Sequence, residues 1–496
     1  MSVEKPLEET RMLHRYPIRL VTIATLFICA FGAGAELKIT VGLTPYQVAQ
    51  CNAEGKGLIL CSGTWSGENG PLSMRILKDA VPLEEWRVVG AAENGQWLAI
   101  IDNIPAGGPY TVAVRIEDTI VSVDGVLVGD LWVLAGQSNM QGVGNMIDVV
   151  QPSPLVNMLA MNGVWRPAQE PLHILAESPD PVHGTFNSEE ERQAAIEGAK
   201  NGPKGAGLGM AFASEMVRRT GRPVGLVCTA HGGTSMEQWN PAGREAGGAS
   251  LYGSMYAQVQ RAGGMIRGAL WYQGESDANP EAMAVFREKC EGLVAAMRRD
   301  FENPDMPFYY VQIGRFVNPG TDPASWNRIQ DLQRTCETSI PRSGMVAAID
   351  LELDDLIHVG TPGLKRLGKR LANLAERDLY GGTIKGGPRP GEITFQDTAY
   401  GKQARVKFNG VNGRLTAAGR PMGFTLSEGP DGAEIPCVYK VELPADAPDT
   451  AVLWLQNVPD NPHLWYGRGL DPCVNITDEA DMAIPVFGPI PMNPAS

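Results

Sequence analysis

Between residues 130 and 380, short apolar runs alternate with segments of helical periodicity, and this feature limits the possible folds most. The apolar runs have the length of buried strands and occupy residues 131–135, 224–230, 268–273, 308–313 and 345–349. The helical patterns lie near residues 206–219, 251–263, 280–301, 323–338 and 362–378. Continuously apolar strands that alternate with helices are typical of a parallel sheet covered on both faces. The sequence therefore predicts an α/β domain whose reactive loops follow the carboxyl ends of the strands.

The segments on either side of this domain lack long helical patterns. Residues 36–129 contain short alternating runs such as LKITVG and YTVAVRI, which are separated by turn residues. Residues 381–496 return to similar runs after a short stretch rich in Gly and Pro. Because 496 residues are too many for one ordinary core, several domains are expected. We therefore predict β-sandwich or jelly-roll-like regions at 36–129 and 381–496 around a catalytic domain at 130–380.

Residues 145–204 interrupt the alternation of strands and helices and are rich in Pro, Asn and Gly. Irregular segments of this length are usually functional or disordered. We expect this segment to form a lid-like insertion over the functional site.

The first 35 residues have the pattern of an export signal. Arg11, Arg15 and Arg19 precede the apolar run LVTIATLFICAFGAGA, which ends in small residues suited to cleavage. The run is short for a membrane span. We expect residues 1–35 to be a signal peptide, the protein to be periplasmic or extracellular, and no stable membrane span to remain after processing.

The charge and cysteine pattern exclude several classes of partner. The formal net charge is −14 without a basic stripe, which argues against nucleic acid as a partner. The cysteines are scattered and form no CxxC pair, so neither a zinc site nor a dense disulfide framework is indicated. Cys51 and Cys61 are candidates for a bridge across a hairpin, although buried thiols are the simpler interpretation. The sequence has no Walker loop, dinucleotide fingerprint or HExxH motif, so we expect no cofactor and no metal.

Polar residues follow several of the predicted strands at the points where these strands end. They should meet at one edge of the sheet, because parallel strands end on the same side. These groups are Ser138 in LWVLAGQSNMQGVG, His231-Gly232-Gly233, Gln273-Gly274-Glu275, and Asp355 with His358.

These residue types fit nucleophilic catalysis. A serine hydroxyl is a weak nucleophile that needs an adjacent base, and His358 is the candidate base for Ser138. Asp355 precedes His358 by three residues, so on a short loop its carboxylate can hold the imidazole in one tautomer. Three alternatives remain at this point. Ser138 is also suited to capping a helix, Asp354 is a second candidate acid, and His231 is a second candidate base.

The motifs GQSNM, GGTSMEQW, WYQGESD and D-x-x-H, in this order, resemble the SGNH/GDSL hydrolase superfamily and more narrowly its sialate O-acetylesterase branch. The resemblance covers about 250 residues of the central domain. It implies a flavodoxin-like hydrolase with a three-layer catalytic domain. The nucleophile elbow of the α/β-hydrolases, G-x-S-x-G, is not met, because Met140 stands at the second position after Ser138.

The resemblance also implies a role for individual residues. Ser138 is the expected nucleophile, His358 the base and Asp355 the residue that holds the base. The oxyanion is expected to bind the N–H groups of Ser138 and Gly233 and the side-chain amide of Gln273, which replaces the asparagine of the wider superfamily. The predicted substrate-binding residues are Gln137, Asn139, Glu275 and Arg468; Glu275 is alternatively a residue that orients Gln273.

The predicted function is that of a carbohydrate O-acetylesterase, a carboxylic ester hydrolase that removes acetyl groups from sugars by a Ser-His-Asp acyl-enzyme mechanism. The resemblance points to acetylated sialic acid as substrate. Acetylxylan or another acetylated glycan is an alternative substrate. A catalytically inactive carbohydrate-binding protein is the alternative from a different functional class.

Overall fold

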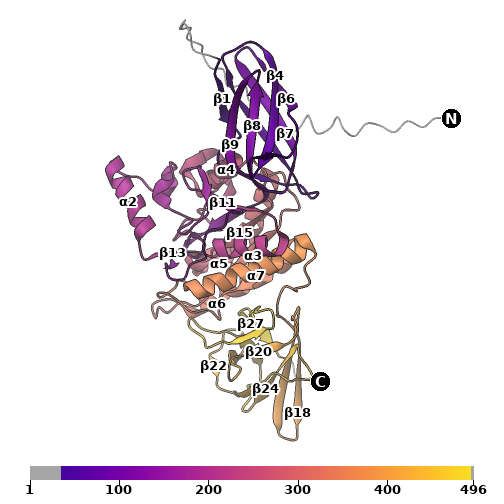
Figure 1. The fold of residues 1–496 in the computed structure, drawn as a ribbon. Coiled ribbons are helices and arrows are strands. Elements are labelled where there is room, and N and C mark those ends of the chain that lie inside the picture. Colours follow the sequence, from indigo (N-terminus) through magenta and orange to yellow (C-terminus); the bar gives the residue numbers. More distant parts are fainter. Residues whose placement is uncertain (1–34, 493–496) are drawn as a thin grey trace, which may run out of the picture.

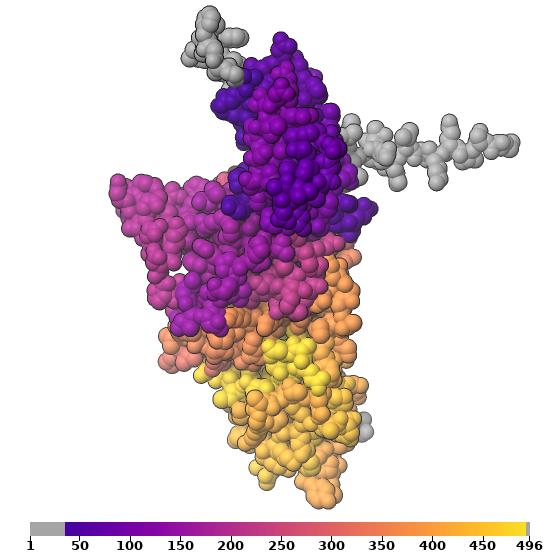
Figure 2. All heavy atoms as spheres, in the orientation of Figure 1, coloured from indigo at the N-terminus to yellow at the C-terminus, as the bar shows by residue number. Residues whose placement is uncertain are grey.

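The structure is a computed structural model that describes residues 35–492. An N-terminal β region, a central α/β region and a C-terminal β region follow one another along an elongated molecule (Figures 1 and 2). The predicted signal peptide falls on residues that, apart from Ala35, lie outside the described part of the chain. Among residues 35–492, no helix combines the length and the apolar character needed to cross a bilayer.

The N-terminal region is an antiparallel β structure with its own core. Its strands follow the order β1-β3-β7-β6-β4-β8-β9, and the short strand β2 pairs with β9 in parallel. Strands such as β7 alternate between buried and exposed residues, as expected where only one face of a sheet packs on a core. Cys51 and Cys61 are buried free thiols, so the suggested bridge between them is not formed. The bounds are β1 Leu37–Val41, β2 Val48–Gln50, β3 Lys56–Trp65, β4 Gly70–Lys78, β5 Val81–Pro82, β6 Arg87–Glu93, β7 Gln96–Pro105, β8 Gly107–Ile116 and β9 Thr119–Gly136.

Strand β9 carries the chain from the N-terminal region into the central region. Its first residues pair with β8 in antiparallel fashion, whereas Asp130–Gly136 pair in parallel with β14 and β15. The burial pattern changes at the same place: residues alternate before Val126 and are all buried from Val126 to Gly136. This change follows from the packing, because the sheet is covered on one face in the first region and on both faces in the second.

The central region contains parallel strands in the order β11-β14-β9-β15-β16-β17, with β12 as an antiparallel edge strand. Each predicted apolar run forms a strand, and each predicted helix is present. The predicted α/β class and the β-rich flanks are therefore confirmed. The strand bounds are β11 Val156–Leu159, β12 Trp165–Pro167, β14 Val224–Cys228, β15 Gly268–Tyr272, β16 Phe308–Gln312 and β17 Ser343–Ala347. The helix bounds are α3 Gly209–Thr220, α4 Leu251–Arg261, α5 Pro280–Asp300, α6 Pro323–Ser339 and α7 Thr361–Tyr380.

Helices cover both faces of this sheet. Neighbouring residues of a strand point to opposite faces, and on β16 the Tyr309 hydroxyl donates to Asp378 of α7 at 2.9 Å, while the Tyr310 hydroxyl donates to the Gln333 carbonyl of α6 at 2.7 Å. Helix α5 begins where the sequence signals it, since the Asn279 side chain accepts from the Ala282 N–H and Pro280 occupies the first turn.

Part of the segment 145–204, for which a lid-like insertion is predicted, belongs to the central sheet. Part of it forms β11, which is completely buried and pairs in parallel with β14. The sequence of β11 is a short run that lies between Pro, Asn and Gly residues. For this reason the sequence pattern did not identify it as a strand. The remainder packs over one end of the sheet and contains helix α2, the 3-10 turns η2 and η3, and short strands. The bounds are β10 Gly144–Asn145, η2 Leu175–Glu177, η3 Pro181–His183, α2 Glu189–Asn201 and β13 Lys204–Ala206.

The C-terminal region is built from small antiparallel sheets, and polar contacts attach it to the central region. Gln312 at the end of β16 donates to the Val486 carbonyl at 2.9 Å and accepts from the Val486 N–H at 2.8 Å. Arg370 of α7 is 1% exposed and contacts Asp350 at 2.7 Å and the Asp481 carbonyl. The strands are β18 Arg389–Thr398, β19 Gly401–Asn409, β20 Leu415–Ala417, β21 Phe424–Glu428, β22 Glu434–Ile435, β23 Val438–Glu442, β24 Thr450–Leu455, β25 Pro462–Tyr466, β26 Ile476–Asp478 and β27 Phe487–Pro491.

Candidate active site

Ser138 is the first residue of the short helix α1 (Ser138–Gln141), directly after strand β9. The chain leaves the strand at Gly136, whose φ is +130° and where a Cβ atom would lie 2.2 Å from the Tyr272 carbonyl oxygen. Only glycine fits this close approach. Gln137 holds the N-cap position, and no side chain caps the helix. The alternative that Ser138 is a helix cap is therefore wrong, and its half-buried hydroxyl forms no hydrogen bond within residues 35–492.

The loop that carries His358 is attached to the residue next to Ser138. The Asn139 side chain accepts from the Val359 N–H at 3.0 Å and donates to the Ile357 carbonyl at 3.4 Å. The two neighbours of His358 are thus held by the residue that follows Ser138. The structure brings the two predicted catalytic side chains to one edge of the sheet. No direct hydrogen bond joins them in the described chain, and such bonds are commonly long before substrate binds.

Asp355 and His358 form the predicted pair. Nδ1 of His358 lies 2.9 Å from both carboxylate oxygens of Asp355. The same carboxylate accepts from the Ile357 N–H at 3.1 Å and the His358 N–H at 2.9 Å, and Nζ of Lys204 lies 2.9 Å away. Partial burial opposes ionisation of Asp355, but these hydrogen bonds together hold the pKa of its carboxyl well below the usual range. Nε2 of His358 is thereby left for a reacting group.

The carboxylate of Asp354, the second candidate acid, accepts hydrogen bonds from backbone N–H groups instead. It accepts from the Asn145 N–H at 2.7 Å and from the Thr361 N–H at 3.3 Å, at the start of α7. It therefore fixes the loop between β17 and α7, and Asp355 is the residue that faces the imidazole.

Two of the predicted oxyanion donors belong to Ser138 itself and to the loop after β14, which contacts Ser138 at Gly232. A Cβ atom on Gly232 would lie 3.4 Å from Cβ of Ser138, so the loop after β14 passes directly over the serine. Gly233 is exposed and has φ +70°, a conformation that favours glycine. Neither the Ser138 N–H nor the Gly233 N–H donates to another group of residues 35–492. Both donors are available to a ligand.

The third predicted oxyanion donor, Gln273, is placed differently. Its side chain is completely buried, and its amide nitrogen donates to the Thr234 carbonyl at 3.0 Å and to Asp277. Both hydrogens of the amide are therefore used inside the protein. The amide is therefore not free to donate to an oxyanion at Ser138. Thr234 and Asp277 both stand in the quoted motifs, but the motifs do not give the direction of the Gln273 side chain.

Gln137, Asn139 and Glu275 lie around Ser138 and contact one another. Gln137 and Asn139 are buried. Oε1 of Glu275 accepts from the Asn139 amide at 2.8 Å. Oε2 lies 3.2 Å from the Gln137 side-chain amide, which donates to it when the amide is oriented with its nitrogen toward Glu275. Glu275 therefore holds the residues on both sides of Ser138. We call this positioning arrangement the Glu275 clamp. Direct contact of these residues with substrate stays a prediction.

Burial raises the pKa of the Glu275 carboxyl to about 7, although the hydrogen bond from Asn139 opposes this shift. Between pH ~4.5 and ~7 the unfolded chain loses this proton before the folded chain does, so stability falls as the pH rises. We expect the Glu275→Gln variant, which does not titrate, to gain about 2–3 kcal/mol relative to the parent protein across this range. Denaturant unfolding of both proteins at pH 5 and pH 8 measures this difference in the free energy of unfolding. A difference between the two proteins that is the same at both pH values would contradict the raised pKa of Glu275.

Arg468, the last predicted substrate-binding residue, is not brought to Ser138. Its guanidinium donates to the Gly432 carbonyl at 2.6 Å and lies 4.7 Å from the ring centre of Trp465. Both partners belong to the C-terminal region. The adjoining residue contacts the central region, since the Gly469 N–H donates to Asn327 of α6 at 2.7 Å.

Two residues near the site were missed by sequence reasoning. Lys204 pairs with Asp355 at 2.9 Å, and Nδ1 of His183 lies 3.1 Å from Nδ1 of His231. Both come from the irregular segment 145–204, in which no motif signals a function. His183, being one of only six histidines, was the available clue.

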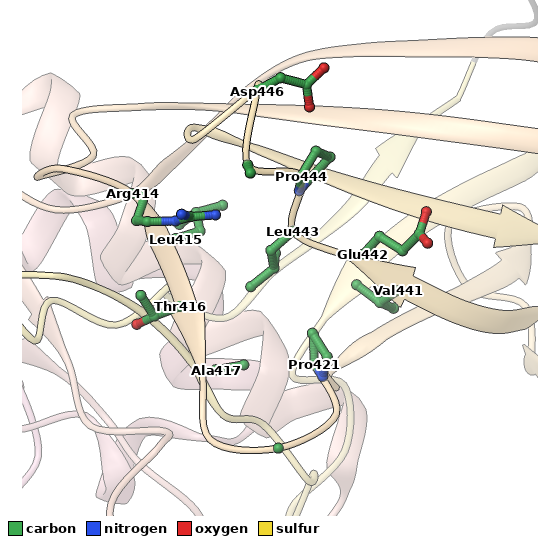
Figure 3. A pocket seen from close by; sticks show the side chains of 12 residues that line it. Arg414, Leu415, Thr416, Ala417, Pro421, Val441, Glu442, Leu443, Pro444 and Asp446 are labelled. Carbon is green, nitrogen blue, oxygen red and sulfur yellow. The ribbon is translucent and has the colours of Figure 1, made fainter.

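A surface hollow of about 630 Å³ lies in the C-terminal region, away from the strand ends (Figure 3). Its walls come from β20, β23 and the loops after them, and include Arg414, Thr416, Glu442 and Asp446. The lining contains no serine, cysteine or histidine. The Ser-His pair that the sequence predicts for acyl transfer therefore does not lie in this hollow.

Comparison with known proteins identifies the family of the chain. The family model for "Carbohydrate esterase, sialic acid-specific acetylesterase" matches residues 128–377, which contain every element of the constellation around Ser138. A probable carbohydrate esterase of Arabidopsis thaliana is 26% identical over 268 residues, which are 49% of this chain and 88% of the plant protein.

Human sialate O-acetylesterase is 25% identical over 308 residues, which are 52% of this chain. The matched part is 55% of the human protein, so the chain spans about half the length of this relative. The crystal structure of a carbohydrate acetylesterase from Xanthomonas citri has the same fold, with a TM-score of 0.67 at 20% identity over 91% of this chain and 99% of that one. The chain therefore belongs to the carbohydrate esterase, sialic acid-specific acetylesterase family and is a carboxylic ester hydrolase.

Proposed function

We propose that the protein is a carbohydrate O-acetylesterase in which Ser138, His358 and Asp355 form the catalytic triad. The observation that carries this proposal is the connection between the two halves of the site: Asn139, next to Ser138, holds both neighbours of His358. Asp355 in turn fixes the imidazole through Nδ1. A nucleophile, a base and a residue that orients the base therefore meet at one edge of the sheet.

In the proposed reaction, Ser138 Oγ attacks the acetyl carbonyl carbon while Nε2 of His358 takes the hydroxyl proton. The N–H groups of Ser138 and Gly233 stabilise the oxyanion of the tetrahedral intermediate. His358 then returns the proton to the sugar oxygen, and the sugar leaves. Water, deprotonated by His358, attacks the acetyl-enzyme, and acetate and free Ser138 are formed. Asp355 is held ionised by its hydrogen bonds and stabilises the imidazolium in both half-reactions.

The substrate class is part of the same proposal. Acetylated sialic acid is the first candidate, and acetylated xylan or another acetylated glycan is the second. We also propose that the central region, from residue 130 to 380, is a flavodoxin-like SGNH hydrolase domain between β domains at 36–129 and 381–496. Residues 1–35 are proposed to direct export to the periplasm or the medium.

Acetate release tests the proposal. Purified protein is incubated with acetylated sialosides, acetylated xylan, acetylated pectin and p-nitrophenyl acetate. We expect acetate from at least one acetylated glycan and no release of long-chain acids from the corresponding esters. Binding of these glycans without hydrolysis would instead establish the carbohydrate-binding alternative and refute the enzyme proposal.

A further inference from the structure

A chain of hydrogen bonds outside the triad ends at the rim of the site. Nδ1 of His231 lies 3.1 Å from Nδ1 of His183, and the two rings stack with centres 5.1 Å apart. Nε2 of His183 lies 3.0 Å from the Ser254 hydroxyl, which donates to Asp180 at 2.6 Å. The hydrogen bonds therefore link Asp180, Ser254, His183 and His231 in this order. They connect η3, α4 and the loop after β14.

The order of donors fixes the tautomers of both histidines. The Ser254 proton is directed to the Asp180 carboxylate, so the Ser254 oxygen accepts a proton from Nε2 of His183. Nδ1 of neutral His183 is then an acceptor, and Nδ1 of His231 must be the donor between the two rings. Nε2 of His231 is left without a proton and acts as an acceptor.

Two members of this hydrogen-bond chain are buried, and Asp180 is half-buried. His183 is 6% exposed and Ser254 is 2% exposed. Asp180 fits tightly against Gly248, where a Cβ atom would lie 2.5 Å from the Asp180 carboxylate. Burial, with the neighbouring His231 ring, lowers the pKa of His183 to about 4, and burial also lowers the pKa of His231. The imidazoles therefore remain neutral at neutral pH, as the tautomer assignment requires.

The outer end of the chain lies next to the reacting centre. His231 is half-buried, and its N–H donates to the Gly136 carbonyl at 3.0 Å. The next residue, Gly232, lies against Ser138. Nε2 of His231 has no partner within residues 35–492 and is not among their buried unpaired atoms. Nε2 of His231 is thus an acceptor of fixed orientation. It belongs to the residue that directly precedes Gly232.

We propose that Nε2 of His231 accepts a hydrogen bond from a sugar hydroxyl adjacent to the acetyl ester, so that His231 is a specificity-determining residue, with His183 and Ser254 as positioning residues. This inference rests on the proposed function. A fixed acceptor favours acetylated polyols over acetyl esters that lack a neighbouring hydroxyl. His231 is unsuited to be the base, because its Nδ1 faces a neutral ring and not a carboxylate.

A pair of matched substrates tests the inference. The first is a mono-O-acetylated methyl glycoside, and the second is its deoxy analogue without the hydroxyl next to the ester. We expect the parent enzyme to prefer the first substrate by about tenfold in kcat/KM, the value of one well-placed hydrogen bond. The His231→Phe variant should lose most of this preference, and His231→Gln, which retains an acceptor near the position of Nε2, should keep part of it.

Equal loss of activity on both substrates in the His231→Phe variant would overturn the inference, because that result indicates a general catalytic or structural role. An unchanged preference would overturn it as well. The Ser235→Ala variant, which alters another side chain of the same loop, is the control and should keep the parental preference. The Ser138→Ala variant is assayed in parallel. If this variant hydrolyses the two substrates, the proposed triad is refuted, whereas the role of His231 is tested only by the substrate preference.

The proposed positioning role of His183 and Ser254 has a spectroscopic test. Nitrogen-15 NMR of the labelled protein should show His231 protonated at Nδ1 and unprotonated at Nε2. In the Ser254→Ala variant, His183 loses its acceptor, so both tautomers of His231 should become populated and the substrate preference should fall in parallel. A parent protein with His231 protonated at Nε2 would contradict the assignment.

Discussion

Replacing Ser138 by alanine is expected to reduce kcat for acetyl ester hydrolysis by about 10⁴-fold or more, which is the scale of removing the nucleophile of a serine triad. The fold should not change, because the Ser138 hydroxyl has no hydrogen-bond partner in the described chain and is only half-buried. We therefore expect the free energy of unfolding to stay within about 0.5 kcal/mol of the parent value.

Initial rates with p-nitrophenyl acetate and an acetylated glycan measure this effect, and denaturant unfolding checks the fold. Ser235→Ala is the matched control, since Ser235 lies in the loop after β14 and its hydroxyl contacts Gln238 at 3.4 Å. This control should retain parental rates. A Ser138→Ala protein with substantial activity, after contaminating esterase has been excluded, would remove Ser138 from the mechanism.

Replacing Asn139 by alanine is expected to reduce kcat by about 10²–10³-fold through loss of alignment between His358 and Ser138, an effect comparable to small misplacements of catalytic groups. Asn139 donates to Glu275 at 2.8 Å and holds the loop of His358 through Ile357 and Val359. Its removal leaves the Val359 N–H and the Glu275 carboxyl without these partners. We expect a loss of stability of about 2–4 kcal/mol from the unpaired groups.

Separate measurement of kcat and of KM distinguishes a role in alignment from a role in substrate binding. If Asn139 positions the triad, kcat falls and KM changes little. If Asn139 instead contacts substrate, as the sequence motif suggested, KM rises at constant kcat. The latter result would contradict the arrangement described here for the Glu275 clamp. Asn373→Ala, which removes an amide on the far helix α7, serves as a control for general destabilisation.

The fold was largely predictable because its signals are local. Buried parallel strands such as residues 308–312 are continuously apolar, and helices such as α5 carry a cap, a Pro in the first turn and an apolar stripe. Strand β11 was missed for the opposite reason. Its four residues lie in a segment rich in Pro, Asn and Gly, and only pairing with β14 makes them a strand. Tertiary contacts of this kind leave no periodic signal.

The site was predictable only in part. The positions of Ser138, Asp355 and His358 follow from strand ends and spacing, and the structure brings them together. The directions of polar side chains do not follow from spacing. Gln273 donates to the nearby Asp277 and to the Thr234 carbonyl, and Arg468 donates to the Gly432 carbonyl. Thr234 and Gly432 belong to segments that are distant in the sequence, so local spacing does not indicate these contacts. The hydrogen-bond partners of buried amides and guanidinium groups can therefore be identified only from the three-dimensional structure.

Covalent labelling tests the central claim most directly. The protein is treated with a p-nitrophenyl organophosphate, digested and mapped by mass spectrometry, in parallel with the His358→Ala variant. Our account predicts one stoichiometric adduct on Ser138, loss of esterase activity in proportion to labelling, and little labelling when His358 is absent. Full inactivation with the adduct on another residue, or hydrolysis that continues while Ser138 is fully labelled, would contradict it.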